Sequence, residues 1–188
     1  MSNELKEEQD VYSEFKIGAR AFPQTYNWSC GPSALRTVLY YQYGINLTEL
    51  EIALVSGANS TGMDDVNFEI GLRNLGLRFK QTSNGTLNKL KSFLIKHKLP
   101  ILHLVMSDGG GHYMVFVGYD AENVYLADPA QGKIIKYGIP FFLGIWKEEE
   151  GETQTRWFIV LTGSKKNKIL TTINKLKGIK KKLDKMVH

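Results

Sequence analysis

The sequence changes character near its middle, and this change most constrains the fold. Up to about residue 98, apolar residues recur with helical spacing. From residue 100 onward, the chain forms short segments that are rich in β-branched and aromatic residues and separated by turn residues. Helical segments that come first and strands that follow favour an α+β fold with an antiparallel sheet.

Capping and turn residues mark where several of the expected elements end. Gly44 ends the first helix, whereas Thr86 opens the last helix and Pro100 terminates it. We expect the helices at residues 30–43, 47–56, 64–75 and 86–97. We expect the strands at residues 77–82, 100–106, 112–119, 123–128, 133–137 and 156–162.

The length of 188 residues predicts one domain with a substantial core and two appendages. Residues 1–19 are polar and are expected to form a loose arm or a short helix. The domain is expected to span residues 20–163, in which the segment 146–156 is unusually polar for a link between late elements. Residues 164–188 form a basic tail.

The net charge of +5 belongs to this tail and not to the domain. Residues 164–188 contain nine lysines and one aspartate, which leaves a charge of about −3 for the rest of the chain. We therefore expect no nucleic-acid partner. Apolar residues at steps of three or four predict a basic amphipathic helix at 165–186. Such a helix could lie on an anionic membrane surface, or dock on the domain or on a partner.

Composition also predicts the compartment. The polar, acidic start lacks the apolar segment of a signal peptide, and no stretch approaches the roughly 18 apolar residues that span a bilayer. A single cysteine excludes an internal disulfide, and the four histidines lack metal-ligand spacing. We expect a cytoplasmic protein whose thiol stays reduced, with no metal and no cofactor.

Cys30, the only cysteine, stands at the start of the first expected helix. The thiolate is the nucleophilic form of cysteine, and the dipole and unpaired N–H groups of a helix N-terminus lower the pKa of a thiol. Pro32 suits the first helical turn, where its missing N–H costs nothing, and Gly31 permits close approach of other groups. The alternative interpretation is a small buried apolar residue.

His112 is the candidate for the base that a thiol nucleophile needs. It follows three glycines, residues 109–111, and opens the strand expected at 112–119, so Gly111 and its neighbours leave space around the imidazole. The other three histidines lie in a polar helix end, inside an apolar strand where a core position is expected, and at the C-terminus (His97, His103 and His188). A strand-edge histidine without a chemical role remains the alternative.

Asp128 is the candidate for the group that orients His112. In a hairpin centred near residues 120–121, Asp128 falls roughly opposite the start of the first strand, within a residue or two. Cross-strand partners share a face and lie about 5 Å apart at the β-carbon. A plain turn aspartate before Pro129 is the alternative.

Residues shortly before Cys30 complete the candidate site. Gln24 lies six residues earlier, close enough for a loop to fold its amide back beside the sulfur as a donor to an oxyanion. Tyr26 and Trp28 are candidates for the walls of a substrate cleft, together with Gly111 near the base.

The order and spacing of these motifs resemble the papain-like cysteine peptidases of the bacteriocin-processing family. Gln24, the Ser-Cys-Gly-Pro start of a helix, the histidine in GGGHYMVFVGY and the aspartate in Ala-Asp-Pro carry the resemblance, which covers roughly residues 20–162. It implies a papain-like fold, in which the helix of the nucleophile packs on a C-terminal antiparallel sheet. It also implies Cys30 as the nucleophile, His112 as the base, Asp128 as its orienter and Gln24 as the oxyanion donor.

The resemblance implies hydrolysis of a peptide or protein substrate, with cleavage of leader peptides after Gly-Gly as the activity best known in that family. The family includes N-terminal domains of ABC exporters and also soluble relatives without a transporter. This chain has no transmembrane stretch and no phosphate-binding GxxxxGK[ST] motif, so we expect a soluble member. The same residues also suit an acyl transferase, transpeptidase or amidase, and the fold alone could bind a peptide without cleaving it.

Overall fold

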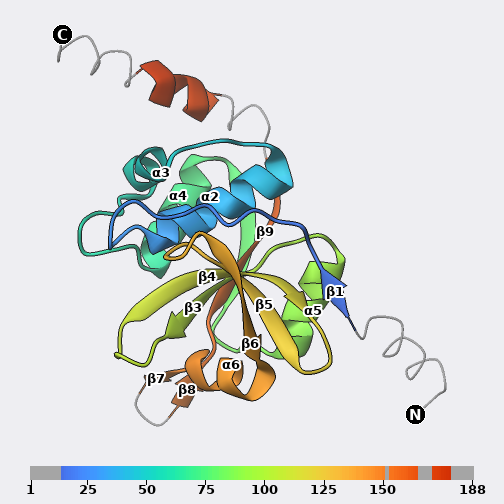
Figure 1. Ribbon diagram of the computed structural model, residues 1–188. Coiled ribbons are helices and arrows are strands. Elements are labelled where there is room, and N and C mark those ends of the chain that lie inside the picture. The colour runs from blue at the N-terminus through green and yellow to red at the C-terminus, as the bar shows by residue number, and fades with distance from the viewer. Residues whose placement is uncertain (1–13, 151–152, 165–170, 179–188) are drawn as a thin grey trace.

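The computed structural model describes residues 14–150, 153–164 and 171–178, shown as a ribbon in Figure 1. The named helices are α2 (Cys30–Tyr43), α3 (Glu49–Ser56), α4 (Asp65–Asn74), α5 (Leu87–Ile95) and α6 (Ile139–Ile145). The strands are β1 (Phe15–Lys16), β2 (Leu77–Thr82), β3 (Ile101–Val105), β4 (Gly111–Tyr119), β5 (Asn123–Asp128), β6 (Lys133–Gly138), β7 (Glu148–Glu150), β8 (Thr153–Thr155) and β9 (Phe158–Ser164).

One antiparallel sheet dominates the molecule. Its strand order is β2-β9-β3-β4-β5-β6, and β1 pairs with β4 in addition. In Figure 1, α2, α3 and α4 gather on one side of this sheet, and the β7–β8 hairpin lies beside α6 at the opposite end. The expected α+β class with an antiparallel sheet is confirmed.

Local capping chemistry sets the helix starts close to where the sequence predicts them. Thr48 and Asp64 each close a capping box, with Glu51 and Asn67 respectively. The hydroxyl of Thr86 accepts a hydrogen bond from the backbone N–H of Lys89. These caps satisfy N–H groups of the first helical turn that have no intrahelical partner, so the ends differ from the expected ones by only a few residues.

Part of the polar N-terminal arm is neither loose nor helical. Residues Phe15 and Lys16 form β1, which pairs with Tyr119 and Gly118 of β4. The backbone N–H of Ile17 then donates to the carbonyl of Val117, and the Ile17 side chain is buried. A strand of two residues is stabilised by its partner and leaves no periodic pattern in the sequence. Residues 1–13 of the expected arm lie outside the described residues.

The late part of the domain contains two elements that the sequence pattern missed. Residues Ile139–Ile145 form α6, which follows the end of β6 directly and has Pro140 in its first turn, where proline is favoured. The polar segment 146–156, expected as a link, includes the β7–β8 hairpin. Neither element is long enough to show the periodicity on which a sequence-based prediction depends.

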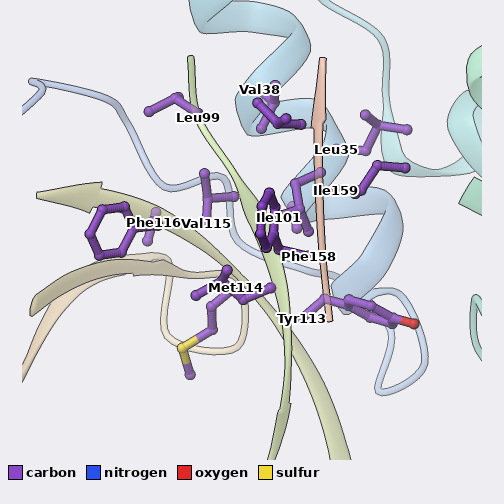
Figure 2. Close-up of a cluster of buried hydrophobic side chains, with 14 of the residues drawn as sticks. Leu35, Val38, Leu99, Ile101, Tyr113, Met114, Val115, Phe116, Phe158 and Ile159 are labelled. Atoms are coloured by element: carbon purple, nitrogen blue, oxygen red, sulfur yellow. The ribbon is translucent and has the colours of Figure 1, made fainter. Parts of the chain in front are cut away.

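The core lies between α2 and the central strands. Figure 2 shows Leu35 and Val38 of α2 close to Ile101, Val115 and Ile159 from β3, β4 and β9. All five side chains are fully buried. The spacing of three residues between Leu35 and Val38 places both on the same face of the helix. This packing fixes α2 across the sheet, and therefore fixes the position of its first residue relative to β4.

The tail is described only at residues 171–178, which are helical. Leu176 is buried, and it lines a pocket together with Leu54, Val55 and Asn74. The hydroxyl of Thr172 donates to the carbonyl of Asn74 at 2.9 Å. This segment therefore packs on α3 and α4, whereas the remainder of the helix expected at 165–186 lies outside the described residues. No helix in the described ranges has the length and apolarity needed to cross a membrane.

Candidate active site

Cys30 is the first residue of α2, as the sequence predicts. Ser29 is the N-cap residue, but its side chain does not cap the helix. Pro32, the third helical residue, has no N–H to be capped. The sulfur accepts hydrogen bonds from the backbone N–H groups of Gly31 and Tyr113. The N-terminus of α2 is therefore open toward the thiol.

Gly31 is required for steric reasons at this position. A β-carbon at residue 31 would lie only 2.9 Å from the β-carbon of Met63, which is buried in the loop between α3 and α4. Real β-carbons essentially never make such a short contact, so a larger residue would displace the start of α2 or the loop. Glycine therefore brings the nucleophile helix into close contact with this loop.

The thiol of Cys30 is hydrogen bonded to the side chain of His112. Burial of the sulfur opposes its ionisation, but the hydrogen bonds and the positive charge of His112 outweigh burial and lower the pKa of Cys30 below its usual value. These interactions favour a thiolate next to an imidazolium. This is the nucleophilic form of the cysteine.

His112 connects Cys30 to Asp128. Its Nε2 lies 2.7 Å from Oδ1 of Asp128, which leaves Nδ1 for the thiol. Burial alone would lower the pKa of His112, but the hydrogen bonds and negative charges of Asp128 and Cys30 raise it to about 9. His112 is therefore protonated at neutral pH.

A β-bulge brings His112 and Asp128 onto the same face of the sheet. Between β4 and β5, Gly118 pairs with Tyr125, but Phe116 pairs with Leu126, so β4 contains one extra residue at Val117. The register beyond the bulge places Met114 opposite Asp128, and His112 shares the face of Met114. Without the extra residue, Asp128 would face the odd-numbered residues of β4. The sequence-based count predicted the meeting of the two side chains but not the bulge that produces it.

Asp128 is held independently of His112. Its Oδ1 also accepts a hydrogen bond from the backbone N–H of Ala130 at 2.8 Å. Burial opposes its ionisation, but the hydrogen bonds from His112 and Ala130 outweigh that effect and lower the pKa of Asp128. The carboxylate therefore stays charged and keeps a fixed direction.

Gln24 is attached to the same end of the sheet. Its backbone N–H donates to the carbonyl of Pro129, the residue after Asp128. Its side-chain Nε2 donates to the carbonyl of Tyr26 at 2.8 Å. Its Oε1 is buried and has no hydrogen-bond partner among the described residues. One hydrogen of the amide is engaged by Tyr26, so the second remains for another acceptor, and the expected donation to an oxyanion stays a prediction.

The remaining predicted residues are Tyr26, Trp28 and Gly111. The rings of Tyr26 and Trp28 stack at 5.5 Å in the loop before Cys30, and Tyr26 is exposed. Gly111 precedes His112 in β4, where a β-carbon would clash with Nε2 of His103. The glycine therefore leaves room for His103, and a role of these residues in substrate binding stays a prediction.

His103 lies closer to the site than the predicted core position implies. It pairs with Tyr113 across β3 and β4, and their rings are 4.7 Å apart. The side chain is half-buried, not fully buried. Burial and the positive charge of His112 lower the pKa of His103, so it is neutral where His112 is charged. The apolar strand pattern around residue 103 gave no indication of this neighbourhood.

Glu49 is a second residue that the sequence analysis missed. Its buried carboxylate accepts hydrogen bonds from Thr25, Ser29 and Ser33, around the start of α2. Residue 49 falls on the same helical face as Ile52, Ala53 and Ser56, which are all buried. The sequence did offer one indication of its burial, since Glu49 shares the helical face of the apolar residues.

The arrangement as a whole suits acyl transfer. A thiolate, a hydrogen-bonded imidazolium and a carboxylate behind it follow the order nucleophile, base and orienting group. No set of three or more His, Cys, Asp or Glu side chains converges as a metal site within residues 14–150, 153–164 and 171–178. The chemistry offered by these side chains is attack on a carbonyl carbon.

Sequence comparison identifies the family and shows similarity to uncharacterized relatives. The sequence pattern described as "Peptidase C39 family" matches residues 20–150 of this chain. An uncharacterized protein of Methanothermobacter thermautotrophicus is 35% identical over 113 residues, which cover 59% of this chain and 72% of the relative.

Solved structures support the fold. The peptidase domain of Streptococcus ComA, a bifunctional ABC transporter involved in quorum sensing, matches with a TM-score of 0.62 and 18% identity, covering 78% of this chain and 99% of the domain. A double-glycine-motif protease from an AMS/PCAT transporter, solved with its leader peptide, matches with a TM-score of 0.60 and 22% identity, covering 80% and 99%. At these identities the likeness establishes the fold alone, and it agrees with the predicted papain-like architecture.

Proposed function

Because the chain belongs to the peptidase C39 family, we propose that it hydrolyses a peptide bond through a thioester on Cys30. The observation that carries this proposal is the continuous hydrogen-bonded series from Cys30 through His112 to Asp128. A cysteine retained for packing alone would need neither partner.

In the first half of the proposed reaction, the thiolate of Cys30 attacks the carbonyl carbon of the substrate. The carbonyl oxygen becomes an oxyanion, stabilised by the backbone N–H of Cys30 and the side-chain amide of Gln24. The imidazolium of His112 gives its proton to the amide nitrogen, the C–N bond breaks, and the amine leaves. A thioester on Cys30 remains.

In the second half, water attacks the thioester carbonyl while neutral His112 takes a proton from the water. The second tetrahedral intermediate collapses, the C–S bond breaks, and the thiolate and imidazolium are restored. Asp128 holds the ring in position throughout and stabilises its positive charge. The reaction needs a reduced thiol, which fits the proposed cytoplasmic location.

For the substrate we propose a leader peptide cleaved after a Gly-Gly pair. The double-glycine-motif protease among the structural neighbours, solved with its leader peptide, supports this choice. A contact of the basic tail with a membrane or a partner remains a separate proposal that this activity does not require.

The test is cleavage of a set of synthetic peptides that carry Gly-Gly or bulkier pairs before the scissile bond, followed by mass spectrometry. We expect cleavage after Gly-Gly by the unmodified protein and none by Cys30→Ala, which removes the nucleophile but little volume. A transpeptidase would instead join the acyl fragment to an added amine such as glycinamide. Turnover that persists in Cys30→Ala, or binding without cleavage, would contradict the proposal.

A further inference from the structure

A buried carboxylate lies beneath the loop that leads into Cys30. Glu49, the first residue of α3, is only 5% exposed. Its oxygens lie 3.1 and 3.0 Å from the backbone nitrogen of Thr25, and Oε2 also accepts from the hydroxyls of Ser29 at 3.1 Å and Ser33 at 2.8 Å. Because none of these three donors carries a charge, the carboxylate is buried without an opposite charge among them. Burying a charge is costly unless it is paired and hydrogen-bonded, and here hydrogen bonds from uncharged donors must compensate.

Two helix N-termini make this burial tolerable. Glu49 stands in the first turn of α3, where the positive end of the helix dipole stabilises an anion. Ser33 belongs to the first turns of α2, so the same carboxylate also lies near the N-terminus of the nucleophile helix. Glu49 therefore connects the start of one helix to the start of the other.

One effect of Glu49 is to direct the hydroxyl of Ser29. A serine at an N-cap ordinarily accepts a hydrogen bond from the second or third N–H of its helix. Here the third residue is Pro32, which has no N–H, and the second, Gly31, donates to the sulfur of Cys30. The Ser29 Oγ instead accepts from the backbone N–H of Tyr26 at 3.2 Å, and its single proton is shared between the carbonyl of Tyr26 at 2.9 Å and Glu49 at 3.1 Å. The N–H groups at the start of α2 thus remain free of a side-chain cap.

The other effect is to anchor the backbone around Gln24. The N–H of Gln24 donates to the carbonyl of Pro129, and the next N–H along the chain, that of Thr25, donates to Glu49. Two successive peptide groups are therefore held, one by the end of β5 and one by α3. The direction of the Gln24 side chain depends on both anchors.

We propose that Glu49 is a positioning residue that fixes the oxyanion-binding side of the site. It acts through Thr25 on the backbone that carries Gln24, and through Ser29 on the open N-terminus of α2. This inference rests on the proposed function, since acyl transfer is the step in which an oxyanion forms.

The experiment compares two reactions of Cys30 that differ in whether an oxyanion forms. Acylation by p-nitrophenyl acetate passes through a tetrahedral intermediate, in which the thiolate bonds to the acetyl carbon and p-nitrophenolate leaves. Alkylation by iodoacetamide displaces iodide at a saturated carbon and forms no oxyanion. We expect Glu49→Gln to slow acylation by about 10–100-fold, since small displacements of catalytic groups cost this much, and to leave alkylation within twofold.

Glu51→Gln is the matched control, because Glu51 lies on the same helix and its capping box with Thr48 accepts glutamine equally well. We expect it to leave both rates unchanged. Ser29→Ala removes one of the hydrogen bonds to the carboxylate and should slow acylation in the same direction by a smaller factor. Circular dichroism melting establishes that each variant is folded.

Three outcomes overturn the inference. In the first, folded Glu49→Gln acylates as fast as the unmodified protein. In the second, acylation and alkylation fall in parallel, which would mean that the carboxylate acts on the Cys30–His112 pair or on the whole fold. In the third, the unmodified protein reacts with neither reagent; then the proposed function fails first and the role of Glu49 fails with it. Slower acylation with intact alkylation supports the inference.

Discussion

The two sides of the candidate site are held in different ways. On the sheet side, His112 and Asp128 stand on neighbouring strands whose backbone hydrogen bonds set their register. On the loop side, Gln24 stands in an irregular segment held by single hydrogen bonds, to the carbonyl of Pro129 and, one residue later, to the buried carboxylate of Glu49. Strand pairing positions the base, whereas separate hydrogen bonds to one backbone carbonyl and one side chain position the oxyanion donor. We therefore expect substitutions on the two sides to differ in their effects on peptide turnover and on alkylation of Cys30.

The largest effect is expected on the sheet side, from His112→Ala. This substitution removes both the proton donor of the leaving amine and the partner that lowers the pKa of Cys30. Peptide turnover should fall by about 10⁴-fold or more, the scale seen when a catalytic triad loses a member. Alkylation at neutral pH should slow as well, because less thiolate is present. Unchanged alkylation would mean that His112 does not hold the thiolate.

Substitutions on the loop side are expected to lower turnover without lowering the reactivity of the Cys30 thiol. Gln24→Ala should lower kcat by about 10²–10³-fold, the usual loss for one oxyanion donor. KM should change little, because the hydrogen bond forms chiefly in the transition state. Alkylation of Cys30 should be as fast as in the unmodified protein.

Gln24→Glu is the informative companion variant, since it replaces a donor with a negative charge facing the oxyanion, and it should be at least as damaging. Steady-state kinetics of both variants distinguish the possibilities. If Gln24→Ala raises KM alone, Gln24 contacts the substrate and the oxyanion is bound by other groups.

The pH dependence of turnover reports on the Cys30–His112 pair and not on the loop side. The pKa of His112 is raised to about 9, so the imidazolium that protonates the leaving amine is lost as the pH rises through 9. Turnover should therefore fall about fivefold between pH 9 and pH 10, and about tenfold for each further pH unit. On the acid side, turnover should begin to fall only at a pH below the usual pKa of a cysteine thiol, because the pKa of Cys30 is lowered. A pH–rate profile with an alkaline limb near 6.5 would show that His112 is not paired in this way.

A smaller loss is expected from Asp128→Asn. The amide oxygen of asparagine still accepts a hydrogen bond from Nε2 of His112, so the ring stays oriented, but the charge is lost. A charge-assisted hydrogen bond exceeds a neutral one by about 1 kcal/mol, which corresponds to roughly fivefold to tenfold in turnover. The alkaline limb of the pH–rate profile should move to lower pH. A loss as large as that of His112→Ala would mean that the carboxylate charge is indispensable.

The smallest effect should come from a residue outside both sides of the site. Thr86→Ala removes the N-cap of α5 and should destabilise the fold by about 1 kcal/mol. The melting temperature should fall by about 2–4 °C. Turnover at 25 °C should stay within twofold. A large loss of turnover would show that activity follows general stability, and would weaken the contrast between the two sides.

The sheet side was largely predictable from the sequence, because its elements are periodic and its turns are marked. The strands 112–119 and 123–128 agree closely with β4 and β5, and their connection is short enough for register counting. The start of α2 at Cys30 was predictable because Pro32 and the ending at Gly44 bracket the helix. In each case the evidence is contained within a few neighbouring residues.

What the sequence did not predict depends on contacts between distant segments. The strand β1 exists because β4 offers unpaired backbone groups beyond its pairing with β3. The hydrogen bonds of Glu49 join residues separated by 16 to 24 positions in the chain. From the sequence alone, Glu49 is typical of an exposed acidic residue in the first turn of a helix, because the loop of Thr25 that covers it is distant in the chain.

The bulge at Val117 has a consequence for how this hairpin can evolve. Side chains alternate across a strand, so the meeting of His112 and Asp128 depends on whether the number of residues between them and the turn is odd or even. An insertion or deletion of one residue in this stretch of β4 would send the base to the opposite face, whereas a change of two would return it to the same face but displace it by about 7 Å along the strand. A single-residue change of length here therefore breaks the pair unless a second bulge restores the register.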